Sequence, residues 1–452
     1  MSEGAPAVQS TSAATPTRGG LGFMLRALHH RNYRLFFSGQ SISLIGTWMT
    51  RIATSWLVYR LTGSALLLGL VGFAGQIPSF LLAPFAGVLV DRWNRHRLLV
   101  ITQVLAMLQS AGLAVLTLAG VINIWHVLAL SLFQGVINAF DMPGRQAFVI
   151  EMVERREDLP NAIALNSSMV NAARLVGPSI GGIIIAAVGE GWCFGLDAVS
   201  YLAVIASLLL MRLGPESHRA RKETKVLHEL REGWRYVAGS APIRSILLLL
   251  ALVSLVGMPY TVLMPVFAST VLHGGPHTLG FLMAAVGVGA LSGAIFLANR
   301  RTVIGLGKII PMMSALFGAG LLGFSLSRVL ALSLLFLFFT GIGFMMQMAA
   351  SNTLLQTLVE DDKRGRVMSF YTMAIMGVTP FGSLLAGGLA HRIGAPNTLL
   401  FGGIGCILAA AWFASLLPKL RERVRPIYIE KGILPEIAEG IRSATRMARP
   451  EQ

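Results

Sequence analysis

Charge is scarce in this chain of 452 residues. Charged residues make up 13% of it, and the 21 Asp and Glu residues are outnumbered by 37 Lys and Arg residues. Because a soluble domain carries about 25% charged residues, this composition argues against a soluble protein. Only two cysteines are present, Cys193 and Cys406, so a disulfide framework is excluded.

Signatures of catalysis are missing as well. The sequence has no His and Cys set with metal-ligand spacing, no nucleophile elbow and no phosphate-binding loop. We therefore expect that the protein is not an enzyme and that it needs no metal or organic cofactor.

Apolar runs are abundant, by contrast, and the mean hydropathy is +0.67. Runs of about 20 residues, the length of a helix that crosses a bilayer, recur along nearly the whole chain. We identify twelve of them, at residues 36–59, 65–90, 98–120, 124–149, 161–188, 193–211, 244–271, 278–299, 306–327, 329–353, 366–390 and 397–417. The sequence therefore predicts an all-α integral membrane protein with twelve transmembrane helices.

Polar segments divide the chain into five parts. The stretch before residue 26 has neither an apolar core nor a cleavage site, so it is predicted to be a disordered tail and not a signal peptide. The predicted parts are a cytoplasmic tail at 1–30, an N-terminal bundle at 31–211, a linker at 212–243, a C-terminal bundle at 244–417 and a cytoplasmic tail at 418–452. Residues 229–239 of the linker are predicted to form a short helix on the membrane surface.

Basic residues follow the predicted topology. All but five of the 37 Lys and Arg residues fall on one predicted side of the membrane; the exceptions are Arg51, Arg60, Arg174, Arg328 and Arg392. This bias predicts that both termini are cytoplasmic. The net charge of +16 then reflects topology and contact with anionic lipid, not nucleic acid. We expect a monomeric, multi-pass protein of the cell (inner) membrane whose partners are the lipid bilayer and a small-molecule substrate.

The two halves of the chain repeat weakly. Met152-Val153-Glu154 precedes the fifth run and Leu358-Val359-Glu360 precedes the eleventh, about 206 residues later, while Pro178 has a counterpart in Pro380. Such internal symmetry is typical of transporters built from two related bundles that rock around a site near the midplane. It predicts two pseudo-symmetric six-helix bundles.

A basic loop joins the second and third runs. It reads Gly87-x-Leu89-x-Asp91-Arg92-x-x-Arg95-x-Arg97. This pattern resembles the loop between helices 2 and 3 of the major facilitator superfamily of transporters. The resemblance implies the major facilitator fold and a gating role for Gly87, Asp91, Arg92 and Arg95. A generic loop that only follows the positive-inside rule is the alternative.

The fifth run contains a Gly-Pro-x-x-Gly-Gly core. Its residues are Gly177, Pro178, Gly181 and Gly182, preceded by Arg174. Proline removes a backbone hydrogen bond and kinks a helix, and the glycines allow close contact with another helix. The core resembles the helix 5 motif of exporters and antiporters of the superfamily, which implies a conformational role for all five residues. A simple packing kink is the alternative.

The eighth run offers a matching row of small residues. We expect the glycines of the fifth run to meet Gly287, Gly289 and Gly293 there, and the resulting seam to seal one side of the pathway.

A longer resemblance covers residues 30–425. It is carried by Asp141-Met-Pro143-Gly-Arg145-Gln146-Ala147-Phe148, by residues 159–168 and by residues 189–194. Together they look like the enterobactin-exporter-like branch of the superfamily, which also includes macrolide efflux proteins. The resemblance implies export of a siderophore-like or drug-like molecule driven by the proton gradient. An importer or a lysophospholipid transporter of the same fold is the alternative. Asp141 and Arg145 are expected to join Asp91 and Arg92 in a gating charge network.

Polar residues inside spans are expensive and are therefore functional candidates. Helices 1, 4, 7 and 10 line the central cavity in this superfamily. On these helices the predicted substrate-binding residues are Gln40, Thr47, Arg51, Gln134, Asn138, Met258, Gln347 and Asn352. Hydrogen bonding between helices is the alternative role for the polar members of this set.

Acidic residues are absent from the last six runs. Candidate proton carriers are therefore Asp91, Asp141, Glu190, Asp197 and His126, all near the ends of spans. Two central arginines, Arg51 and Arg174, without a central acid favour an anionic or catecholate cargo over a cationic drug.

Overall fold

The computed structural model describes residues 25–212, 226–300, 302–431 and 433, and only the backbone of residues 83, 84, 87, 88, 91, 92, 226–230 and 430. Most of the two predicted tails and part of the linker lie outside the described residues, as do the side chains of Asp91 and Arg92 and any contact of Gly87. Within the described residues, all regular elements are helices.

The first half of the chain forms one group of helices. They are η1 (Arg26–His29), α2 (Arg31–Thr62), α3 (Ala65–Ala74), α4 (Ile77–Arg92), α5 (Arg95–Leu118), α6 (Ile124–Met152), η2 (Arg156–Asp158), α7 (Leu159–Val188) and α8 (Glu190–Leu209). The linker contributes α9 (Val226–Gly239), at the place where the sequence predicts a surface helix.

The second half forms the other group. It consists of α10 (Ala241–Val256), α11 (Tyr260–Val266), η3 (Phe267–Val271), α12 (Pro276–Ala298), α13 (Leu306–Leu326), α14 (Leu330–Leu358), α15 (Arg364–Thr372), η4 (Met373–Gly377), α16 (Thr379–Ile393) and α17 (Ala395–Glu430).

Eleven helical stretches among the described residues are long and apolar enough to cross a membrane. The twelfth predicted span corresponds to α2, whose 32 residues extend for about 48 Å at 1.5 Å per residue. Its arginines and polar residues lower its hydropathy, and it packs between α7 and α8. The structure thus confirms the predicted all-helical fold with twelve membrane segments in two groups.

Three spans that the sequence analysis treats as continuous are interrupted. The second divides between α3 and α4 around Gly75 and Gln76, and the seventh between α10 and α11 at residues 257–259. The eleventh contains a π-helical turn, η4, just before Pro380. Proline lacks the N–H that a continuous helix needs, and glycine disfavours helix, so the breaks fall at these residues.

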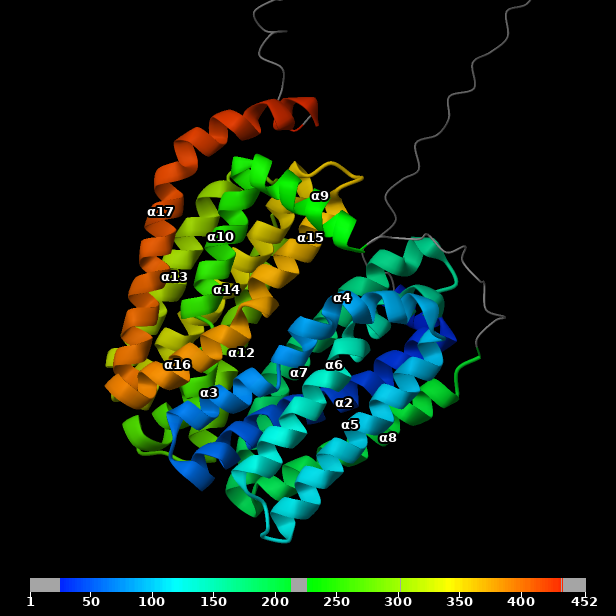
Figure 1. The fold of residues 1–452 in the computed structure, drawn as a ribbon, viewed down its shortest axis with the longest axis vertical. Helices are drawn as coiled ribbons and strands as arrows, with labels where there is room; N and C mark the ends of the chain where they lie inside the picture. Colours follow the sequence, from blue (N-terminus) through cyan, green and yellow to red (C-terminus); the bar gives the residue numbers. More distant parts are fainter. Residues whose placement is uncertain (1–24, 213–225, 301, 432, 434–452) are drawn as a thin grey trace, which may run out of the picture.

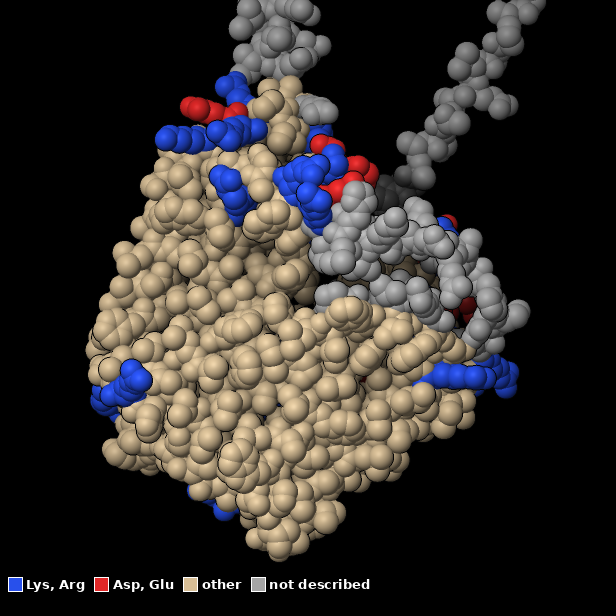
Figure 2. Space-filling view, in the orientation of Figure 1, with Lys and Arg blue, Asp and Glu red and all other residues tan. Residues whose placement is uncertain are grey.

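The two groups of helices meet at one end of the molecule and diverge toward the other, as Figure 1 shows. We call the end that carries η1, η2 and α9 the linker face, and the opposite end, with the turns at 63–64, 189 and 394, the far face. Charged side chains gather at the linker face around α9 and the end of α17, and they are few on the body below (Figure 2). This distribution fits a body surrounded by lipid.

The last helix continues past the predicted end of its span at residue 417. α17 runs to Glu430 and contains Pro418 and Pro426. Just after it, the Nζ atom of Lys431 donates hydrogen bonds to the carbonyl oxygens of Thr357 (2.8 Å) and Val359 (3.1 Å), where α14 ends. A cation at these free carbonyls is favourable, so it ties the end of α17 to the linker face.

Candidate functional site

Two glycine contacts join the bundles near the far face. A Cβ atom on Gly182 of α7 would lie 2.8 Å from the carbonyl oxygen of Pro276 and 3.0 Å from the Cα of Gly280, both on α12. A Cβ atom on Gly387 of α16 would lie 2.8 Å from the Cα of Gly69 on α3. The same kind of contact thus occurs at related places in both halves and closes the far face.

The partner of this seam on α12 differs from the prediction. Gly182 meets Gly280, whereas a Cβ atom on Gly287 would meet Leu175 of α7, and Gly289 and Gly293 face α14. The expectation that all three of these glycines meet the fifth helix is therefore wrong for the last two. Residues 289 and 293 are four apart and share one side of a helix with 3.6 residues per turn, whereas residue 287 lies on the opposite side, so the three cannot form one smooth face.

The other glycines of the motif in α7 pack inside the N-terminal bundle. A Cβ atom on Gly177 would lie 2.5 Å from the Cβ of Trp48, and one on Gly181 would lie 2.8 Å from Ile52 of α2. Pro178 is buried between them, and α7 continues through it. The motif therefore joins α7 to α2 on one side and to α12 on the other.

Two arginines share one tryptophan beside this motif. The guanidinium carbon of Arg51 lies 4.7 Å from the ring centroid of Trp48, and that of Arg174 lies 5.7 Å from it. Arg51 is exposed, Arg174 is partly exposed, and the two like charges act on each other. Among the side chains that the structure describes, no carboxylate pairs with either arginine. We call Trp48, Arg51 and Arg174 the arginine cluster.

The arginine cluster lies where the two bundles face each other. Arg174 belongs to α7, and the next residue, Leu175, packs against Gly287 of α12 in the other bundle, where a Cβ atom would lie 3.1 Å from it. Cation–π contacts are worth about 0.5–2 kcal/mol each, but they do not neutralise the charge. The cluster therefore remains a positive site with a flat apolar surface, which suits a planar anion.

The charged residues near the linker face form two separate contacts. The buried carboxylate of Asp141 pairs with Arg145 on the same helix and accepts hydrogen bonds from Thr102 (3.0 Å) and Gln103 (2.6 Å) of α5. Arg95 pairs with Glu151 of α6 at 2.7 Å. These contacts join α5 to α6. The predicted link from Asp141 and Arg145 to Asp91 and Arg92 stays a prediction, because the side chains of Asp91 and Arg92 lie outside the described residues.

Among the side chains that the structure describes, no cation pairs with the carboxylate of Asp197. Its Oδ2 atom accepts hydrogen bonds from Ser110 of α5 (2.7 Å) and Thr50 of α2 (2.8 Å), and the residue is 1% exposed. By contrast, Glu190 forms a two-pronged pair with Arg60, at 2.7 and 3.3 Å. Sequence reasoning names Asp197 as one of five proton candidates but gives no means of separating it from the others.

The remaining substrate candidates have no contact with Arg51 or Arg174 among those found in the described residues. Thr47 contacts the hydroxyl of Tyr201 at 3.4 Å inside the N-terminal bundle, and Gln40 is buried. Four of the other five pack within their own helices or against the C-terminal core: the Gln134 amide donates to Asn138 (3.1 Å), Asn352 accepts from Gln356 (2.9 Å), and Met258 is partly buried against the core. Of the eight, Arg51 is the one that reaches the arginine cluster.

Gln347 is unusual among these candidates. It is 1% exposed, and neither its amide nitrogen nor its amide oxygen has a hydrogen-bond partner among the described residues. Ser351, one turn further along α14, is also buried without a partner for its hydroxyl. These groups are hidden from cargo in this conformation.

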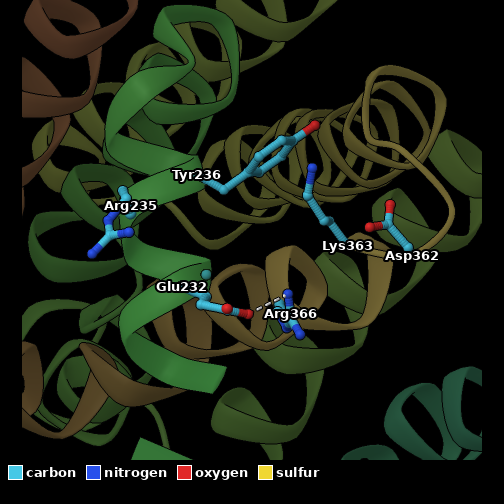
Figure 3. A pocket seen from close by; sticks show the side chains of 7 residues that line it. Glu232, Arg235, Tyr236, Asp362, Lys363 and Arg366 are labelled. Atoms are coloured by element: carbon cyan, nitrogen blue, oxygen red, sulfur yellow. Dashed lines mark ion pairs between the residues drawn. The ribbon is translucent and has the colours of Figure 1, made fainter. Parts of the chain in front are cut away.

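A surface pocket of about 430 Å³ lies at the linker face, away from the arginine cluster. It is lined by Glu232, Gly233, Arg235, Tyr236, Asp362, Lys363 and Arg366. In Figure 3, Arg366 pairs with Glu232 at 2.9 Å, and Lys363 lies over the ring of Tyr236. Side chains of both signs line it, and the ion pair between Arg366 and Glu232 holds α9 against α15.

Comparison with known proteins agrees with this architecture. A model of the transmembrane secretion effector family, which belongs to the major facilitator superfamily, matches residues 24–427. The staphyloferrin A transporter of Staphylococcus aureus is 28% identical over 393 residues, which cover 86% of this chain and 97% of that protein. The multidrug efflux pump Tap of Mycolicibacterium fortuitum is 28% identical over 390 residues, 83% and 93% of the two chains. The macrolide efflux protein A of Streptococcus pyogenes is 22% identical over 407 residues, 87% and 98%.

Solved structures share the fold. A bacterial homologue of the human lysosomal transporter Spinster, inward-facing and unoccupied, superposes with a TM-score of 0.66 at 14% identity, over 89% of this chain and 99% of that one. A POT family transporter in complex with 5-aminolevulinic acid gives 0.69 at 12% identity, over 86% and 96%. With the family model, the two bundles and the glycine seams in agreement, this chain is a multi-pass membrane protein of the transmembrane secretion effector family, within the major facilitator superfamily.

Proposed function

We propose that the protein is a proton-driven exporter that moves an anionic, siderophore-like or drug-like molecule across the cell membrane by alternating access. In this proposal it works as a monomer with both termini in the cytoplasm, so that the linker face is the cytoplasmic side. The bundles are closed at the far face and diverge toward the linker face, which is the arrangement that would admit cargo from inside.

The observation that carries the proposal is the arginine cluster. Two guanidinium groups, with no carboxylate partner among the described side chains, flank one aromatic ring between the bundles. Guanidinium binds planar carboxylates with two parallel hydrogen bonds and stacks on aromatic faces. The staphyloferrin A transporter among the relatives supports a siderophore-like cargo, and the two efflux proteins support a drug-like one.

The sign of the cargo charge matters for the energy of export. Moving one elementary charge across the membrane is worth about 2.3 kcal/mol per 100 mV. With the inside negative, an anion is driven outward, so an anionic cargo uses the membrane potential in addition to the pH gradient. A cationic cargo would have to move outward against the membrane potential at the same cost per charge.

The test is an export assay in a host without its own siderophore and drug exporters. We expect the protein to lower the retention of a catecholate siderophore, and an uncoupler to abolish this effect. Unchanged retention of every siderophore and drug in the panel, with the protein correctly inserted, would refute export and leave import or lysophospholipid transport as the alternative.

The arginine cluster is tested in the same cells with Arg51→Ala. This change removes one guanidinium from a charge-assisted contact worth about 1.5–3 kcal/mol, so export of the anion should fall about 10-fold or more. Arg244→Ala, at the start of α10 and remote from Trp48, is the matched control and should export like the wild type. Normal export of anions by Arg51→Ala would show that the cluster does not bind the cargo.

A further inference from the structure

The proposed proton coupling requires a group that binds a proton within the membrane, and the buried carboxylates of the described residues differ in this respect. Asp141 lies against Arg145, and Glu190 lies against Arg60. Each of these carboxylates is paired with an arginine. Asp197 is held by hydroxyl groups alone.

The two oxygens of Asp197 have different surroundings. Oδ2 accepts hydrogen bonds from both Thr50 and Ser110. Oδ1 has one long contact, 3.4 Å from the hydroxyl of Ser200, and that hydroxyl already donates to the backbone carbonyl of Asp197 at 2.7 Å. An ionised carboxylate buried without a cation or a full set of donors is costly. A proton on Oδ1 removes that cost and leaves both bonds to Oδ2 in place.

Few other titratable groups surround this carboxyl. On its own helix, α8, these are Cys193 and Tyr201; the thiol of Cys193 contacts the carbonyl oxygen of Gly181 on α7 (3.7 Å), and the hydroxyl of Tyr201 contacts Thr47. α5 contributes the neutral Ser110 and Gln109 beside it.

The charged groups on the surrounding helices have other partners. On α2, Arg51 acts on Arg174 of α7 and stacks on Trp48. On α6, Asp141 and Arg145 pair with each other. Asp197 is therefore the buried acid of the described residues that is free to change its protonation.

The segment of α2 from residue 46 to residue 52 connects this carboxyl to the rest of the site. Gly46 packs directly over Oδ1, where a Cβ atom would lie 2.5 Å away, and Thr50 donates to Oδ2. The same segment carries Trp48 and Arg51 of the arginine cluster. Trp48 also packs on Gly177 of the seam helix α7. About two turns of helix thus contact the carboxyl, the arginine cluster and the seam helix α7.

We propose that Asp197 binds the coupling proton and that residues 46–52 of α2 transmit its protonation to the arginine cluster and to the seam. Loss of the proton leaves an ionised Oδ1 under Gly46, and α2 must shift on α8 to admit a donor or water. That shift moves Trp48 against Gly177. This inference rests on the proposed proton coupling but predicts proton binding whether or not a cargo is present.

Proton binding is tested directly on the purified protein in lipid nanodiscs by infrared difference spectroscopy between acidic and alkaline buffer. A neutral carboxyl group has a C=O stretch that an ionised one lacks. We expect the wild type to show a titrating band from a buried carboxyl and Asp197→Asn to lose it. Glu190→Gln is the matched control, because Glu190 is buried beside Arg60, and it should keep the band. A band that persists in Asp197→Asn would overturn the assignment.

The conformational role needs a second measurement. Spin labels at Ser168 of α7 and Thr353 of α14, both exposed in different bundles, report the distance between the bundles. We expect their distance distribution to change with pH in the wild type and in Asp197→Glu, and to become independent of pH in Asp197→Asn. A pH response that survives in Asp197→Asn would refute transmission through Asp197.

The two measurements also separate this inference from the proposed function. Should the infrared band and the pH response depend on Asp197 while export ignores an uncoupler, proton binding at Asp197 stands and proton-driven export fails. Should export require the proton gradient while Asp197→Asn keeps the band, the proposed function stands and the assignment of the proton site fails.

Discussion

Gly387→Ala should shift the balance between the two conformations of the protein, and its neighbour provides the control. A Cβ atom at Gly387 would lie 2.8 Å from the carbonyl oxygen of Ala65 and 2.8 Å from the Cα of Gly69, whereas one at Gly388 would meet no heavy atom within 4 Å. Ordinary contact begins near 3.4 Å, so α16 must move about 0.6 Å away from α3 in the first variant. In the second variant nothing moves.

The size of the effect follows from the cost of overpacking. Forcing extra atoms into a tight contact costs about 1–3 kcal/mol, and every 1.4 kcal/mol is a factor of ten in population. The contact exists when the far face is closed, so Gly387→Ala should disfavour that conformation about 5- to 140-fold. Alanine also favours helix over glycine, but this term acts equally in both conformations and in both variants.

The assay uses spin labels at Ser168 and Thr353 in lipid nanodiscs. We expect the population with separated labels to fall in Gly387→Ala in favour of a shorter distance, and to stay unchanged in Gly388→Ala. Equal distance distributions in the two variants would refute the argument that the glycine seam holds the far face closed.

Three further changes test other contacts. Gly182→Ala should shift the same distribution as Gly387→Ala, because its Cβ atom would lie 3.0 Å from the Cα of Gly280. Glu232→Ala removes an exposed pair at the linker face, so it should increase hydrogen exchange in α9 while changing the stability of the fold by less than about 1 kcal/mol. Asp158→Asn should make the segment before α2 more sensitive to protease. In the wild type a hydrogen bond from His30 holds the pKa of Asp158 below its ordinary value. The stabilising contact is therefore present above the ordinary pKa of Asp and lost as the pH falls through the lowered one, which protease sensitivity measured against pH would show.

The spans could be predicted from the sequence because the bilayer imposes one length and one composition on each of them. Their interruptions could not. Gly75, Pro259 and Pro380 lie inside apolar runs, and a membrane helix tolerates such residues where neighbouring helices satisfy the freed backbone groups. Whether the helix continues or breaks depends on those neighbours, such as Pro78 against Gly135.

The residues of the candidate site could be predicted from the sequence, but the contacts between them could not. The cost of burying charge marks Arg51 and Arg174 as functional candidates, since both stand in apolar runs. Trp48, which brings the two together, carries no signal of its own among the apolar residues around it. Likewise, the glycines of the seam are visible in the sequence, but their partners Gly280 and Gly69 follow from the way the bundles meet.

An anionic cargo and a proton on Asp197 raise the question of whether binding of one favours or opposes binding of the other. Electrostatics alone makes an anion at Arg51 favour a proton nearby, so the two would bind together, as in a symporter. Proton-driven export requires the opposite, because one ligand must leave the site before the other is taken across. Packing must then prevent the anion and the proton from binding at the same time. An anion between Arg51 and Arg174 has to pull residues 46–52 of α2 into the position that the protonated Asp197 disfavours. Binding of 2,3-dihydroxybenzoate to the purified protein, measured across a range of pH, tests this argument. We expect the wild type to bind the anion more weakly in acid, and Asp197→Asn to bind it with an affinity that does not depend on pH. Stronger binding in acid would show that electrostatics dominates and would rule out exchange of this anion for a proton at Asp197.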